Sequence, residues 1–203
     1  MVLQIDDPRT EHALIEQRRA CGIDQFDEVW EGVYIMAPAP NIEHQGLVWA
    51  LGRMLGDVVV DPGIGRVYPG VNVTDRDDWQ QNFRVPDIAV FLNDTEAEDA
   101  DTRWRGPVDF LIEVISPGDR SRDKMPFYEK LGVREALLVD RDPWQLELYR
   151  HQNDKLLPIG VSRLPESVWL ECDRIPIRLR LVEGEKRPVI EVGQIAGERR
   201  WVI

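Results

Sequence analysis

The spacing of apolar and polar positions predicts two helices and a hairpin near the start of the chain. Residues 8–21 have mixed helical periodicity, and a glycine follows them as a stop signal. Residues 26–36 contain two short apolar runs around one glycine, a pattern typical of a β-hairpin. After Asn41, apolar positions follow a helical stripe to about Gly56, and the side chain of Asn41 can cap that helix.

The central part of the chain is rich in strand patterns. Apolar runs bounded by turn residues predict strands over residues 67–73, 85–92, 108–115, 135–141 and 146–150. A turn at 116–118 ends the third of these strands, and a helix follows from about residue 122 to Leu131. Pro126 is tolerated only in the first turn of that helix, so Lys124 is expected at or near its start.

The last part of the chain changes character. From residue 155 onward, prolines separate short β-like segments, which we expect to cover one edge of the fold or to build a dimer contact. The length of 203 residues indicates one domain over residues 1–203. We expect a core of about residues 20–150 and a β-rich extension over residues 155–203.

The composition and net charge indicate which binding partners and which cellular location to expect. The net charge of −12 argues against a broad basic face that binds nucleic acid. A local basic groove remains open, formed by Arg103, Arg105, Arg120, Arg122, Lys124 and Lys130. No apolar run has the length of a membrane span, and the N-terminus lacks the pattern of a signal peptide. Cys21 and Cys172 have no metal or redox motif around them, which indicates free thiols in the cytoplasm.

Glu113 stands out because it lies within the almost wholly apolar strand predicted over residues 108–115. A buried carboxylate is costly unless another group compensates its charge. Two explanations are open at this point. Glu113 could share a divalent cation with Asp87, which opens the preceding strand, or it could form a buried ion pair with an arginine such as Arg84.

The combination of Asp87, Glu113 and Lys124 has a chemical meaning. Carboxylates from neighbouring strands can meet at one edge of a sheet and supply the oxygen ligands that Mg²⁺ prefers. A bound metal lowers the pKa of a water ligand, and a nearby lysine can orient that water and stabilise charge on a phosphorus centre. These residues therefore indicate hydrolysis of a phosphodiester bond.

Several short motifs carry a resemblance to a known family. They are VPD at 85–87, IEVISP at 112–117, DK at 123–124, FYEKLGV at 127–133, VD at 139–140, and, nearer the N-terminus, EVWEG at 28–32 and EHQ at 43–45. Together they resemble the bacterial putative restriction endonucleases of the PD-(D/E)XK superfamily, once catalogued as a domain of unknown function. The resemblance covers roughly residues 20–150.

The resemblance implies an α/β (α+β) fold with a restriction-endonuclease-like mixed β-sheet core flanked by helices. It implies a Mg²⁺-dependent endonuclease, with Mn²⁺ as a substitute, that hydrolyses DNA. Asp87 and Glu113 then become metal ligands, with the backbone carbonyl of Val114 as a further ligand. The superfamily lysine usually follows the glutamate by two residues, where this chain has Ile115. The family instead places it on the following helix, at Lys124 here.

Two accessory candidates are weaker. Glu31 resembles the acid that precedes a glycine in the family's first hairpin, although an acid there is more often a turn residue. His44 lies early in the helix after Asn41, where the superfamily often has an active-site residue. A histidine that only satisfies a local hydrogen bond explains it equally well.

Other functions remain open from the sequence alone. A homodimer is expected, because cutting two DNA strands requires two sites. A catalytically degenerate module that binds a protein or nucleic acid without cleavage is the main alternative, and the net charge of −12 favours it slightly. A third possibility is hydrolysis of RNA or of a small phosphodiester.

Overall fold

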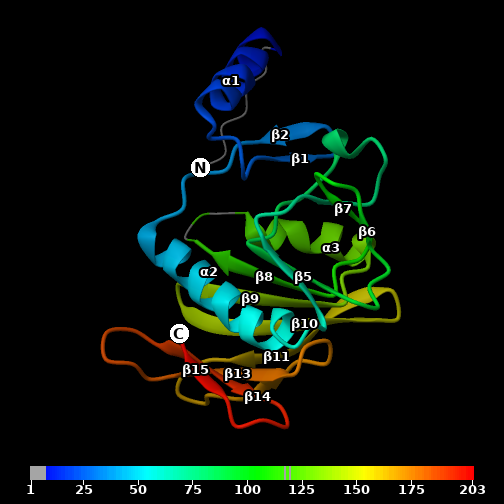
Figure 1. Ribbon diagram of the computed structural model, residues 1–203. Coiled ribbons are helices and arrows are strands. Elements are labelled where there is room, and N and C mark those ends of the chain that lie inside the picture. The colour runs from blue at the N-terminus through cyan, green and yellow to red at the C-terminus, as the bar shows by residue number, and fades with distance from the viewer. Residues whose placement is uncertain (1–7, 117, 119) are drawn as a thin grey trace.

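A six-stranded mixed sheet forms the centre of the computed structural model, which describes residues 8–116, 118 and 120–203 (Figure 1). The strand order is β11-β10-β9-β8-β5-β3, with β8 and β9 parallel and the other neighbours antiparallel. The strands are β3 Gly65–Pro69, β5 Ile88–Leu92, β8 Phe110–Ile115, β9 Glu135–Arg141, β10 Trp144–Gln152 and β11 Lys155–Ser162.

Helices cover the two faces of this sheet, because alternate strand residues are apolar on both sides. Helix α2 (Ile42–Leu55) extends into a π-helical turn, η1 (Gly56–Val60), and shares one core with Ile112 and Val114 of β8. On the opposite face, a 3₁₀ turn, η3 (Ser121–Lys124), leads into α3 (Met125–Leu131), which packs on Leu111. Such burial on both faces explains why β8 is apolar almost throughout.

The N-terminal elements lie at one end of the sheet (Figure 1). Helix α1 (Pro8–Cys21) precedes a hairpin of β1 (Glu28–Trp30) and β2 (Val33–Ile35), and a bridge between Val29 and Phe83 joins the hairpin to the core. The remaining short elements are β4 Val73–Thr74, η2 Trp79–Gln81, β6 Glu98–Asp99 and β7 Trp104–Arg105, of which the strands form a small sheet.

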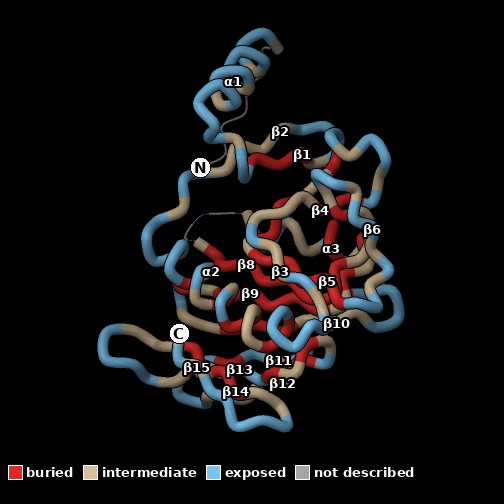
Figure 2. The backbone as a smooth tube through the Cα atoms, viewed as in Figure 1, coloured by how far each residue is buried: buried red, intermediate tan, exposed pale blue. Residues whose placement is uncertain are grey.

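The C-terminal strands form a second, antiparallel sheet against the α2 side of the core. This sheet contains β12 Leu170–Glu171, β13 Ile177–Val182, β14 Val189–Gln194 and β15 Arg200–Val202. Its apolar side chains, such as Leu181 and Val192, are buried in the same cluster as α2. Figure 2 marks the buried stretches of β13 and β14 in red. The two layers therefore share one hydrophobic core.

The expected boundary of the extension at residue 155 needs correction. Strand β11 pairs with β10 along its whole length, from Gln152 opposite Lys155 to Leu146 opposite Ser162. A hairpin of this kind belongs to the core sheet, so the second sheet follows Ser162. The predicted strand over residues 67–73 is also displaced, because β3 ends at Pro69.

The other main elements confirm the pattern in the sequence. Asn41 caps α2 by accepting a hydrogen bond from the backbone nitrogen of His44 at 2.8 Å. Pro126 lies in the first turn of α3, and Gly132 ends that helix in the left-handed region at φ 80°. Pro117, part of the predicted turn, lies outside the described residues. Within the described part of the chain, no helix is long and apolar enough to cross a membrane.

Glu135 ties the C-terminal segment to the core, and its replacement provides a test of the fold. The fully buried carboxylate accepts hydrogen bonds from Arg150 and from the backbone nitrogens of Asp173 and Arg174. Glu135→Gln should lower the free energy of unfolding by roughly 1–3 kcal/mol, because buried donors lose acceptors. Urea denaturation measures this change. The exposed Glu96, which pairs with Arg134, is the control; a change in Glu96→Gln as large as in Glu135→Gln would contradict the account.

Candidate active site

Glu113 faces an ammonium group and a phenol. Its side chain lies on the α3 side of β8, and the residue is 1% exposed. The Lys124 Nζ lies 3.1 Å from each carboxylate oxygen, and the hydroxyl of Tyr128 donates a hydrogen bond to Oε1. The ion pair that compensates Glu113 is thus with Lys124. The alternative partner, Arg84, instead lies between the rings of Trp30 and Phe127, at 4.5 and 4.2 Å.

A second buried carboxylate, Glu28 of β1, completes the surroundings of the lysine. Its Oε1 lies 2.9 Å from Lys124 Nζ and accepts a hydrogen bond from the backbone nitrogen of Val85 at 2.7 Å. Its Oε2 accepts a hydrogen bond from the Trp30 indole at 2.6 Å. The sequence analysis did not select Glu28. An available signal was an acid within the short apolar strand EVW, the same kind of signal that identified Glu113.

Asp87 occupies a junction between three elements. It directly precedes β5, and its Oδ2 accepts a hydrogen bond from the backbone nitrogen of Val114 at 2.7 Å. The Nε2 of His44, on α2, lies 3.2 Å from the same carboxylate. The structure therefore brings together Asp87, His44 and the backbone of Val114. The other ring nitrogen of His44 is buried and has no hydrogen-bond partner among the described residues.

Glu31 belongs to a different group of contacts. It occupies the β1–β2 turn with a positive φ of 47°. Its carboxylate pairs with Arg76 at 2.7 Å and accepts a hydrogen bond from Asn82 at 2.9 Å. These contacts anchor the hairpin turn, so the structure does not bring Glu31 into the cluster around Lys124.

Three carboxylates around one ammonium group shape the protonation of the site. Burial is the largest cause that raises the pKa of Glu113, to about 8. The attraction of Lys124 lowers this pKa only in part, and the repulsion from Asp87 and Glu28 raises it further. Burial alone lowers the pKa of Lys124, but the attraction of Glu113, Glu28 and Asp87 outweighs it and raises that pKa. Lys124 therefore keeps its charge, while Glu113 can hold a proton near neutral pH.

The chemistry of these residues fits a hard divalent cation. Asp87 and Glu113 offer carboxylate oxygens, and the charge of Asp87 adds to the larger effect of burial in raising the pKa of Glu113. Within the described residues, no three His, Cys, Asp or Glu side chains are grouped so that they could hold a metal ion. Two carboxylates with water in the remaining positions are a usual arrangement for Mg²⁺.

Comparison with known proteins identifies a family for the chain. The model of the family Uma2, described as "Putative restriction endonuclease", matches residues 23–181. A solved structure of a "putative nuclease belonging to DUF820" from Anabaena variabilis ATCC 29413 is 22% identical, with a TM-score of 0.58 over 72% of this chain and 81% of that chain. That likeness shows a common fold. No curated protein matches. Because the family model spans most of its length, the chain belongs to the Uma2 family of putative restriction endonucleases.

Proposed function

We propose that the chain is a Mg²⁺-dependent endonuclease that hydrolyses phosphodiester bonds of DNA, with Mn²⁺ as a substitute. One observation carries the proposal. Lys124 comes from the start of a helix, yet its Nζ lies 3.1 Å from both carboxylate oxygens of Glu113. The lysine is thus directed at the acid although residue 115, the usual superfamily position, is isoleucine.

In this proposal each residue has a distinct role. Asp87 and Glu113 would hold the cation, with the carbonyl of Val114 as a further ligand. When bound, the cation would lower the pKa of a water ligand and neutralise charge on the phosphate. Lys124 donates a hydrogen bond to the attacking water and stabilises the growing negative charge. His44 orients Asp87, with which it is in contact.

The charged surface bears on how DNA would bind. Four of the side chains that could form a local basic groove have acidic partners: Arg105 pairs with Asp77 and Glu98, Arg120 with Asp123, Arg122 with Glu147 and Asp140, and Lys130 with Asp75. DNA must compete with these carboxylates, so binding should be weak and should fall steeply with salt. The proposal further takes the enzyme to be a cytoplasmic homodimer.

A second candidate is the catalytically degenerate module that binds without cutting. Its support is that Lys124 and Tyr128 already satisfy Glu113 without a metal ion. The net charge of −12 supports it as well. The two candidates differ in one measurable property, which is metal-dependent strand cleavage.

Nicking of supercoiled plasmid, together with calorimetric titration of Mg²⁺ and Mn²⁺, tests the proposal. We expect cleavage with either cation and none in EDTA. Ca²⁺ serves as a control that can occupy an oxygen site without supporting the same chemistry. Absence of metal binding at millimolar concentration would refute the proposed endonuclease activity. Binding of metal and DNA without cleavage would favour the degenerate module.

A further inference from the structure

The turn that carries Lys124 is short. Element η3 is a 3₁₀ helix of four residues, Ser121–Lys124, and such turns have poorer hydrogen-bond geometry than an α-helix. Among the described residues, no side-chain hydrogen bond caps η3 at Arg120 or α3 at Lys124, although Arg120 pairs with Asp123 at 2.8 Å. The Lys124 side chain is only 13% exposed and contacts two carboxylates. Contacts with other elements help to fix its position.

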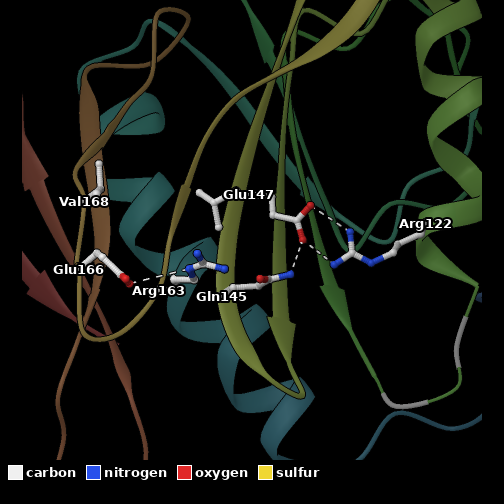
Figure 3. A pocket seen from close by; sticks show the side chains of 7 residues that line it. Arg122, Gln145, Glu147, Arg163, Glu166 and Val168 are labelled. Carbon is white, nitrogen blue, oxygen red and sulfur yellow. Dashed lines mark hydrogen bonds and ion pairs between the residues drawn. The ribbon is translucent and has the colours of Figure 1, made fainter.

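Arg122 provides such a contact, two residues before the lysine. Its guanidinium donates hydrogen bonds from Nη1 and Nη2 to the two carboxylate oxygens of Glu147 on β10 (Figure 3). Nη2 also donates to Asp140 on β9 at 2.8 Å. This forked geometry fixes both the distance and the orientation of the two side chains. Arg122 thus fastens η3 to two neighbouring strands of the central sheet.

Glu147 is itself held in place for this contact. Gln145 and Tyr149, at alternate positions of β10, donate hydrogen bonds to its oxygens at 2.8 and 2.7 Å. Burial alone would raise the pKa of Glu147, but the hydrogen bonds from Arg122 and Tyr149 outweigh it and lower that pKa. The Glu147 carboxylate therefore stays charged at neutral pH and presents a fixed acceptor to Arg122.

The two side chains leave the turn in different directions. A 3₁₀ helix has three residues per turn, so side chains two residues apart do not lie on one side. Lys124 reaches inward to Glu113, whereas Arg122 reaches β10 and lines an open pocket of about 500 Å³. Arg120, which directly precedes the turn, lies 4.3 Å from the ring of Trp30. The turn is thus attached to the surrounding structure by Arg120 as well as by Arg122.

We propose that Arg122, held by Glu147, is a positioning residue that directs Lys124 at Glu113. This inference rests on the proposed function, because it presupposes a catalytic role for Lys124. Arg122 and Glu147 are distinct from the two carboxylates that are proposed to bind the cation. Arg122 would act through Lys124 and would touch neither the cation nor the reacting phosphate.

Arg122→Met and Glu147→Gln test the inference, with Arg134→Met as a matched control that removes an exposed arginine from its pair with Glu96. We expect each test variant to lower kcat for plasmid nicking by roughly 10–100-fold, because a small misplacement of a catalytic group costs rates of that order. In Glu147→Gln, which keeps the charge of Arg122, KM for DNA should stay within about twofold, and both variants should keep their affinity for Mg²⁺ within about twofold. Combining the two substitutions should add little to either alone, since both break the same contact.

Hydrogen exchange provides a readout that needs no cleavage activity. In both test variants, backbone exchange over residues 121–128 should become faster, while exchange in β1 and β14 should remain as in the wild type. If the wild type cuts no DNA, the proposed function fails, but a local increase in exchange still supports the fastening of the turn. Unchanged exchange over residues 121–128 would overturn the inference. So would wild-type cleavage rates, or a loss no larger than in Arg134→Met.

Discussion

Lys124→Met should lower the free energy of unfolding by roughly 3–5 kcal/mol above about pH 8, where Glu113 is ionised in the wild type, because removing one partner of a buried ion pair leaves uncompensated charge. The ammonium group of Lys124 contacts Glu113 and Glu28, which are 1% and 4% exposed. Methionine has a similar length but no charge, so the carboxylates lose their compensation while the packing changes little. Urea denaturation of the variant and the wild type measures the difference.

The pH dependence of this loss has a definite sign. The pKa of Glu113 is raised to about 8, so this carboxyl group binds a proton more tightly in the folded wild type than in the unfolded chain. The stability that Glu113 contributes is therefore lost as the pH rises from the pKa of the unfolded chain to about 8. Without Lys124, the folded-state pKa of Glu113 rises further, and the loss continues above pH 8. There the deficit of Lys124→Met should grow by up to about 1.4 kcal/mol per pH unit.

A second substitution separates charge from packing. Adding Glu113→Gln to Lys124→Met removes one of the unpaired carboxylates and should restore much of the lost stability, while cleavage stays absent. Equal stability of Lys124→Met and the double variant at pH 9 would contradict the ion-pair account. The exposed Lys130, which pairs with Asp75, serves as the control, and Lys130→Met should change stability by no more than about 0.5 kcal/mol.

Asp87→Asn should abolish metal-dependent cleavage, with a loss of at least about 10³-fold in kcat/KM, since its carboxylate is proposed to hold the cation. The amide oxygen of asparagine can still accept the hydrogen bond from the backbone nitrogen of Val114. The fold should therefore persist. Removal of the negative charge relieves repulsion on Glu113 but also removes an attraction on Lys124, so the two effects on stability oppose each other.

Two measurements on the same sample separate loss of metal binding from loss of the fold. Calorimetry should find no Mg²⁺ binding by Asp87→Asn, and thermal unfolding should give a midpoint close to that of the wild type. Asp123→Asn, which removes an exposed carboxylate paired with Arg120, should keep both metal binding and cleavage. If Asp87→Asn binds Mg²⁺ with wild-type affinity, Asp87 is not a ligand.

The sequence predicted the central elements well because their signals are local. The cap at Asn41, the stop at Gly132 and the proline in the first turn of α3 each depend on a few adjacent residues. The sequence placed residues 155–162 in a β-rich extension, whereas the structure pairs them with the core sheet. Pairing of β11 with β10 adds a strand to the core, and the proline within β11 made the segment resemble the irregular region that follows.

The candidate site was predicted only in part. Glu113 and Lys124 were selected from sequence, and the structure brings them into contact. Glu28 was missed because its place depends on long-range pairing, in which Val29 bridges to Phe83 and brings β1 over the lysine. Direct sequence reasoning also could not show that Arg122 and Glu147 meet, since 25 positions separate them. Side chains from distant segments converge only after the sheet has formed.

The shared core between α2 and the C-terminal sheet limits how far this nuclease fold can be reduced. Leu181 and Val192 complete the packing around α2, the helix that holds His44 beside Asp87. A minimal catalytic fragment ending at Ser162 would leave that side of the helix facing water. Such a fragment would expose an apolar surface and would be prone to aggregation. For protein engineers, the second sheet is therefore part of the hydrophobic core, and new modules are better attached at the polar loops between its strands.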